Sequence, residues 1–165
     1  MLAEKFTQVF REEHRKIRDT LLELIDAFSR SELKRARDLL KQVAQTAGPH
    51  FRYEEESLYP ALVKIFGDEY VDFLYSEHDR AISRAGRLVQ LAQKESLSEQ
   101  ETDQAVQLIR KILPHVSDCD GLSIMVERLP EKTVQNILDT RDRSNIEGLN
   151  LMQWVDQVRK RPVPV

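Results

Sequence analysis

The chain has 165 residues, of which 32% are charged and 41% hydrophobic, and its net charge is -3 at pH 7. This length is typical of a single domain, and the weak negative charge argues against nucleic acid as a partner. One cysteine excludes an internal disulfide, charges run through the N-terminal segment, and no apolar run approaches the roughly 18 residues of a membrane span. We therefore expect a cytoplasmic protein without membrane contact.

Apolar residues recur at three- and four-residue steps, which predicts helices along nearly the whole chain. The first expected helix has His14 on its apolar stripe and ends at a break over residues 29–31, where Ser31 is a plausible N-cap for the next helix. The second expected helix ends at Gly67. His50 and Glu54 lie one turn apart on its apolar face.

The third expected helix begins near Asp68 and has His78 in phase with its apolar positions. Ser98, followed three residues later by Glu101, forms a capping-box pattern at the start of the fourth, which contains His115. Four helices with short connections predict an all-α fold, an up-down-up-down four-helix bundle over residues 1–130.

Residues 131–165 are predicted to form a C-terminal helical extension whose end, RKRPVPV, is a frayed tail. Apolar residues of the extension could pack on the bundle. They could also form the contact of a homodimer.

All four histidines fall into a duplicated frame. His50 follows His14 by 36 residues, and His115 follows His78 by 37. Glu-His opens each half, and Pro-His followed by acidic residues closes it. A single core histidine is more often hydrogen-bonded than a ligand, but burying four imidazoles and a carboxylate without partners would cost several kcal/mol. Imidazoles with carboxylates suit divalent iron, manganese or zinc, so we predict a metal site.

These residues resemble the hemerythrin-like (HHE cation-binding) family, four-helix bundles with a non-haem di-iron centre. The segment HFRYEEESLYPAL contains the family's H-x-x-x-E in His50 and Glu54, and EEH and SEHDR are similar to the motifs of the first and third helices. The resemblance covers residues 10–130. It implies two iron ions, one bound by His14 and His50, the other by His78 and His115, with Glu54 bridging them.

The sequence departs from the family in the third helix. Leu74 stands one turn before His78, where oxygen-carrying relatives place a histidine. One iron should therefore lack a protein ligand and bind water, a small anion or an unexpected side chain. Tyr75 is a poor candidate because it lies about 60° around the helix from His78.

The last ligand is expected shortly after His115. Asp120 fits the spacing of the oxygen carriers and is the favoured ligand. A regular helix would rotate Asp120 about 140° from His115, so this spacing requires a local distortion, which Pro114 and a π-bulge could provide. Asp118 and Cys119 are the alternatives, although an inward cysteine is more often a small core residue.

The acidic run continues beyond Glu54 with Glu55 and Glu56, which should face solvent. Replacing Glu55 by alanine should then affect neither metal binding nor stability.

The function predicted from this pattern is a non-haem di-iron protein that binds oxygen or nitric oxide, or that senses iron or redox state. The alternatives are a di-iron oxidoreductase acting on peroxide or nitric oxide, and a metal-stabilised protein-interaction module. Whether the chain is an enzyme stays open at this point. The Glu-x-x-His pairs of ferritin-like enzymes and the H-E-x-x-H motif of zinc proteases are both missing.

Overall fold

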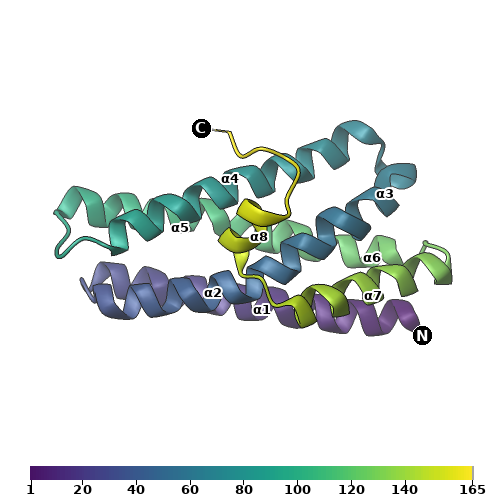
Figure 1. Cartoon of the computed structure of the whole chain (residues 1–165), viewed down its shortest axis with the longest axis horizontal. Coiled ribbons are helices and arrows are strands. Elements are labelled where there is room, and N and C mark those ends of the chain that lie inside the picture. The colour runs from purple at the N-terminus through teal and green to yellow at the C-terminus, as the bar shows by residue number, and fades with distance from the viewer. Residues whose placement is uncertain (165) are drawn as a thin grey trace.

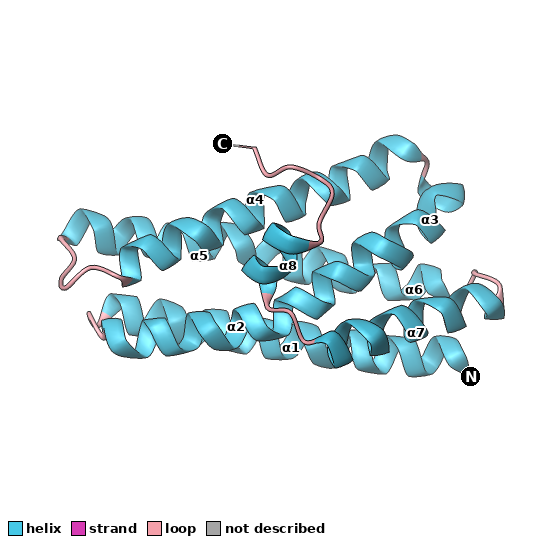
Figure 2. Cartoon of the chain, in the orientation of Figure 1, coloured by secondary structure: helices cyan, strands magenta, loops and turns pink. Residues whose placement is uncertain are grey.

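The computed structural model describes residues 1–164, which form helices and connecting loops without a strand (Figure 2). The predicted all-α class is thereby confirmed. The elements in chain order are α1 (Leu2–Ser29), α2 (Leu33–Tyr53), the π-helical turn η1 (Glu54–Leu58), α3 (Tyr59–Phe66), α4 (Asp68–Ala92), α5 (Glu99–Asp120), α6 (Leu122–Val126), α7 (Glu131–Glu147) and α8 (Leu151–Gln157).

The long helices enclose a common interior. Helix α1 packs against α2 and α5, while α4 packs against α5 and α2 (Figure 1). The apolar stripes expected from the sequence face this interior, because burying them is the main favourable contribution to folding. Helix α3 follows α2 and η1 in the chain and packs on α4.

The interior contains two apolar clusters, and the histidines lie between them. Along the sequence, each histidine lies between one residue of each cluster. These neighbours are Phe10 and Ile17 for His14, Tyr53 and Ala47 for His50, Leu74 and Ala81 for His78, and Cys119 and Ile112 for His115. All four imidazoles therefore enter the bundle at one level, between two dry regions.

Two of the helix ends predicted from local sequence are present in the structure, and one predicted N-cap is not. The Ser98 hydroxyl accepts a hydrogen bond from the Glu101 backbone N–H at 3.1 Å, and the Glu101 carboxylate accepts from the Ser98 N–H at 3.0 Å. Gly67, with a φ of 82°, ends α3 as predicted. The prediction that Ser31 is an N-cap is wrong: Ser31 has a φ of 58°, and Glu32 holds the N-cap position.

The C-terminal extension docks on the bundle. Helix α7 packs against α1 and α2, and α8 packs on α2 (Figure 1). The side chain of Trp154 in α8 is buried, with 1% exposed. The connection between the two helices passes so close to Gly48 that a Cβ atom there would lie 2.3 Å from the Leu149 carbonyl oxygen. The expectation of a frayed tail is wrong for Arg159, whose side chain is 1% exposed, whereas Val165 lies outside the described residues.

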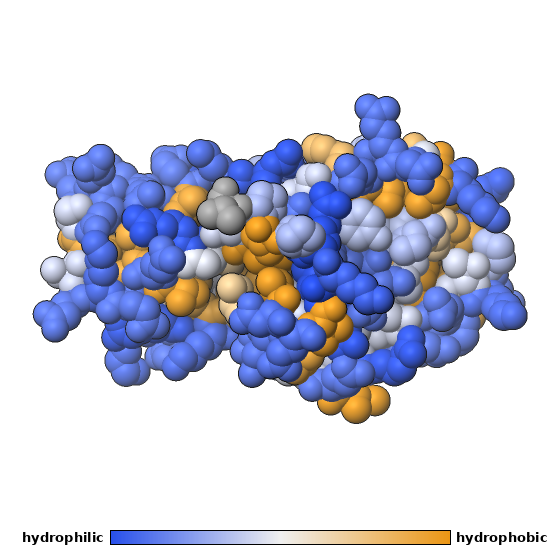
Figure 3. Space-filling view, turned by 45° about the horizontal axis from the view of Figure 1, so that its top comes forward, coloured by the Kyte–Doolittle hydropathy of each residue, from blue (hydrophilic) through white to orange (hydrophobic). Residues whose placement is uncertain are grey.

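Hydrophilic residues cover most of the face drawn in Figure 3, and hydrophobic residues appear between them as separate patches. Among residues 1–164, no helix combines the length and the apolar composition that crossing a membrane requires.

Candidate metal centre

Five buried side chains from different parts of the chain meet in the interior. Each is at most 7% exposed: His14 from α1, His50 from α2, Glu54 from η1, His78 from α4 and His115 from α5. The structure thus brings together five of the six residues expected to bind metal.

Glu54 lies between the two histidine pairs. Its Oε1 atom is 3.3 Å from Nε2 of His50, and its Oε2 atom is 3.0 Å from Nε2 of His78. Nε2 of His14 lies 3.0 Å from Nε2 of His50. On the other side, Glu54, His78 and His115 each offer a ligand atom within 4.8 Å of the others. One carboxylate therefore faces both halves of the duplicated frame.

The chemistry of this cluster fits a bound cation. Oε2 of Glu54 is buried without a hydrogen-bond partner, since its contact with His78 is not aligned for a hydrogen bond. A buried polar atom without a partner is costly and rare in folded proteins. A divalent ion would bind this oxygen together with the inward nitrogens, which are its preferred ligands.

Protonation differs among the histidines. Burial, together with nearby His78, lowers the pKa of His115 to about 3, so this imidazole is neutral and its lone pair is free to bind a metal. Burial also lowers the pKa of His14, and the neighbouring His50 lowers it further.

The pKa values of His50, His78 and Glu54 are shifted by their contacts with one another and with nearby glutamates. Burial lowers the pKa of His50, but Glu54 and Glu13 outweigh this effect and raise it to about 10. For His78 too, burial lowers the pKa, and contacts with Glu54 and Glu55 raise it overall. The pKa of Glu54 lies well below its usual value, because His50 and His78 more than offset its burial. Without a cation, His50 is thus protonated at neutral pH, beside the carboxylates of Glu54 and Glu13.

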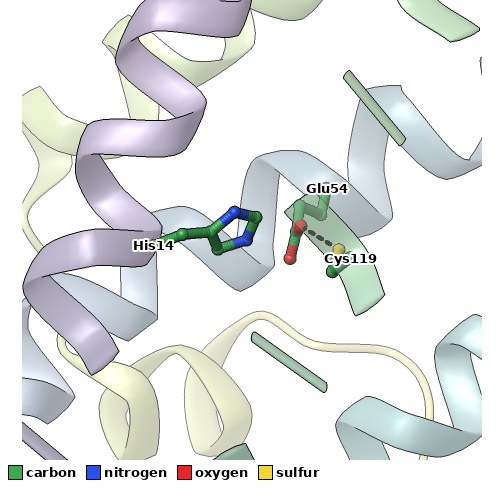
Figure 4. A group of neighbouring side chains, drawn as sticks. All are labelled: His14, Glu54 and Cys119. Atoms are coloured by element: carbon green, nitrogen blue, oxygen red, sulfur yellow. Dashed lines mark hydrogen bonds between the residues drawn. The ribbon is translucent and has the colours of Figure 1, made fainter. Parts of the chain in front are cut away.

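The end of α5 presents Cys119, and not Asp120, to the cluster. The Cys119 thiol donates a hydrogen bond to Oε1 of Glu54 at 2.9 Å, and Figure 4 shows the ring of His14 pointing toward this pair. Ligand atoms of His14, Glu54 and Cys119 lie within 4.8 Å of one another.

Asp120 lies on the outer side of His14. One carboxylate oxygen of Asp120 is 3.1 Å from Nδ1 of His14, and the other is 3.3 Å from the Arg11 guanidinium. The local distortion that would turn Asp120 toward His115 is not present, because α5 is an α-helix through Asp120, without a π-bulge near Pro114. Asp118 is exposed. Direct metal binding by Asp120 stays a prediction.

The π-helical distortion lies instead at η1, where the Tyr59 backbone N–H donates to the Glu54 carbonyl, five residues back. A regular α-helix would place these residues about 140° apart, whereas the wider turn lets both side chains reach the cluster. The Tyr59 hydroxyl lies 2.9 Å from Nε2 of His78. Sequence reasoning missed Tyr59 for this reason. Tyr75, considered a poor candidate, donates to the Glu55 carbonyl at 3.0 Å instead.

Two glutamates contact the outer nitrogens of the histidines. Nδ1 of His50 lies 2.7 Å from Glu13, and Nδ1 of His78 lies 3.0 Å from Glu55. The prediction that Glu55 faces solvent is therefore wrong, since its side chain is 8% exposed. Glu56 does face solvent, with a side chain 40% exposed. Carboxylates at this position orient the ring of a metal-binding histidine.

A cavity and a pocket border the histidine cluster. A cavity of about 60 Å³ borders His14, His50 and His115, and its other walls are almost entirely aliphatic. By volume it could hold a few water-sized molecules, but its walls favour an apolar guest. A polar pocket of about 220 Å³ approaches His14 from another side, between the arginines of α1 and Asp120.

A family model described as "Hemerythrin HHE cation binding domain" matches residues 5–122. The matched segment contains the four histidines, Glu54 and Asp120, and it ends before α7. Comparisons with curated proteins and with solved structures gave no match.

Proposed function

Since the chain belongs to the hemerythrin HHE cation-binding family, we propose that it is a non-haem di-iron protein that binds dioxygen or nitric oxide. The observation that carries this proposal is the position of Glu54, whose two buried oxygens each face a different histidine pair. A carboxylate placed in this way can bind two ions at once. We also propose that the four long helices follow one another in up-down-up-down order, as expected for this family.

We assign His14 and His50 to one ion, and His78 and His115 to the other. The last ligand comes from the end of α5. Asp120 remains the proposed residue, and it would have to leave Nδ1 of His14 to reach the metal. Cys119 is the alternative, because its thiol already contacts Glu54.

Bound iron would supply electrons and open coordination positions. The aliphatic walls of the 60 Å³ cavity, which borders His14, His50 and His115, favour a small uncharged guest inside it. The volume of this cavity suits a diatomic molecule better than an organic substrate.

One observation favours a second function, a di-iron oxidoreductase acting on peroxide. The polar pocket beside His14 is lined by Arg11, Arg15 and Arg18, which would admit a hydrated polar molecule that the aliphatic cavity disfavours. The two candidates therefore predict different small molecules at the centre.

Anaerobic reconstitution with ferrous iron tests the proposal. We expect two iron ions per chain by elemental analysis, and absorption bands that appear with oxygen or nitric oxide and disappear when the gas is removed. Continuous turnover of peroxide, measured with the same sample, would instead favour the oxidoreductase. One ion or none per chain would contradict both functions.

A further inference from the structure

Two arginines of the C-terminal extension contact the glutamates that orient metal-binding histidines. We propose that Arg141 and Arg159 are positioning residues of the metal centre, each acting through one glutamate on one histidine pair. This inference rests on the proposed di-iron function. Both residues lie outside the segment that matches the family, residues 5–122.

The first connection runs from the C-terminal segment to His78. Nε of Arg159 donates to one oxygen of Glu55 at 3.0 Å, and Nη2 donates to the other at 2.8 Å. The latter oxygen, Oε1, is also 3.0 Å from Nδ1 of His78. Arg159 is anchored further by Asp79, at 2.7 Å from Nη2, and its side chain is 1% exposed.

The second connection runs from α7 to His50. Nε of Arg141 donates to Oε1 of Glu13 at 2.6 Å. The other oxygen of Glu13 lies 2.7 Å from Nδ1 of His50 and accepts a hydrogen bond from the Tyr53 hydroxyl, also at 2.7 Å. The two connections have the same order: arginine, glutamate, Nδ1 of a histidine whose Nε2 faces Glu54.

Their physical effect follows from the geometry of the carboxylates. A carboxylate that contacts only an imidazole can rotate about its own bond, and the ring then loses its fixed direction. A guanidinium holds the carboxylate through directional, charge-assisted bonds, and it also compensates a buried negative charge. Fixing Glu13 and Glu55 therefore fixes the directions in which His50 and His78 present Nε2.

The third histidine with a carboxylate on Nδ1 differs. Asp120 beside His14 is paired with Arg11, which belongs to α1 and has a side chain 53% exposed. The extension thus reaches one histidine in each half of the duplicated frame, His50 in the first and His78 in the second.

The test uses the full chain with Arg141→Lys or Arg159→Lys. Lysine keeps the positive charge but loses the planar guanidinium, through which Arg159 binds both oxygens of Glu55 and Arg141 binds one oxygen of Glu13. The matched control is Arg161→Lys, because Arg161 lies two residues from Arg159 but contacts Asp79 and Asp72, and not Glu55.

The first readout is the Mössbauer spectrum of protein loaded with iron-57. We expect Arg159→Lys to change the signal of one iron, Arg141→Lys that of the other, and Arg161→Lys neither. The iron affinity of the two test variants should fall about tenfold, the lower end of the range for residues that orient metal ligands. Unchanged spectra in both variants would overturn the proposal, as would equal changes at both irons, which indicate a general loss of structure.

The second readout does not require iron. Nitrogen-15 NMR of the histidine rings, recorded on the protein without metal, reports the hydrogen bond at each Nδ1. Arg159→Lys should shift the Nδ1 signal of His78 and leave that of His50, and Arg141→Lys should do the reverse. Absence of this selectivity would reject the positioning role. If the wild-type chain takes up no iron, the di-iron function fails while this measurement still decides the positioning role.

Discussion

His50 and His115 belong to one buried cluster but have opposite protonation at neutral pH. Burial lowers the pKa of both, to about 3 for His115, where Glu54 compensates only in part. At His50, direct contacts with Glu54 and Glu13 reverse the effect of burial and raise the pKa to about 10. A metal ligand must be neutral imidazole, so His50 has to lose a proton when it binds an ion.

Metal binding should therefore release protons. At pH 7 we expect at least one proton to be released as the centre is loaded, because the folded-state pKa of His50 lies well above 7. Calorimetric titration in buffers of different ionisation enthalpy measures this number. The release should shrink as the pH approaches the pKa of His50. No proton release at pH 7 would show that His50 is neutral before it binds metal.

Glu54 and Glu56 form a matched pair for substitution. In the proposed di-iron centre, Glu54→Ala should abolish binding of both ions and lower the free energy of unfolding, since it leaves buried His50 and His78 without the carboxylate that they share. Glu56→Ala should do neither, because it removes only a surface pair with Arg52, worth about 0–1 kcal/mol. Elemental analysis and denaturant unfolding test both statements. Metal loss in Glu56→Ala comparable to that in Glu54→Ala would contradict them.

In the proposed di-iron centre, Tyr59 should limit access to the ion beside His78. Its hydroxyl lies 2.9 Å from the nitrogen that would bind the ion, so Tyr59→Phe should increase azide affinity without changing the fold. Visible titration of the ferric protein measures the affinity, with exposed Tyr70→Phe as the control. Unchanged azide binding in Tyr59→Phe would mean that the hydroxyl lies away from the coordination sphere.

Leu74→His tests the same region from α4. The new imidazole should fill the coordination position that the sequence leaves without a ligand. We expect weaker azide binding and more reversible oxygen binding, and absorption spectroscopy measures both. Azide affinity equal to that of the wild type would show that residue 74 does not face the iron.

At the scale of helices, three- and four-residue spacing of apolar positions predicted the long helices and placed each histidine inside. Periodicity could not predict η1, because one π-turn changes the direction of a few side chains without altering the apolar pattern around it. That turn explains why Tyr59 was missed. The Glu55 partner, Arg159, is 104 residues away in the chain, so no local pattern indicates the pair.

Two glycines inside helices should respond in opposite ways to alanine. Gly86→Ala in α4 should stabilise the protein by about 0.5–1 kcal/mol, because nothing lies within 4 Å of the new methyl and alanine favours helix. Gly48→Ala in α2 should destabilise it, because the new methyl would meet backbone atoms of residues 149–151, where the chain enters α8, at 2.3–2.7 Å. Denaturant unfolding gives both values. Equal stabilisation by the two substitutions would show that this segment is free to move away.

At the scale of the whole molecule, the extension completes both apolar clusters. Leu151 and Trp154 belong to one cluster, and Val134, Ile137 and Leu138 belong to the other. The sequence predicted that such residues could pack on the bundle, but periodicity cannot say which surface a helix covers. The division between residues 1–130 and 131–165 stays a prediction.

Removal of residues 131–165 should destabilise the bundle. Each large apolar side chain taken from the core removes about 1.5–3 kcal/mol of burial, so a total of several kcal/mol is expected. Thermal or denaturant unfolding of the truncated chain measures the loss, and removal of residues 162–165 alone, which keeps Arg161, is the control. A truncated chain as stable as the full one would show that residues 1–130 fold independently.

The close crossing at Gly48 also limits how this architecture can evolve. Any residue larger than glycine at that position, two before His50, would exclude the backbone that leads from α7 into α8. Homologues that share this path should keep glycine there, whereas those with a bulkier residue must lead their C-terminal segments elsewhere. One position in the middle of the chain would then separate lineages able to acquire the arginine contacts from those that had to stabilise their histidines by other means.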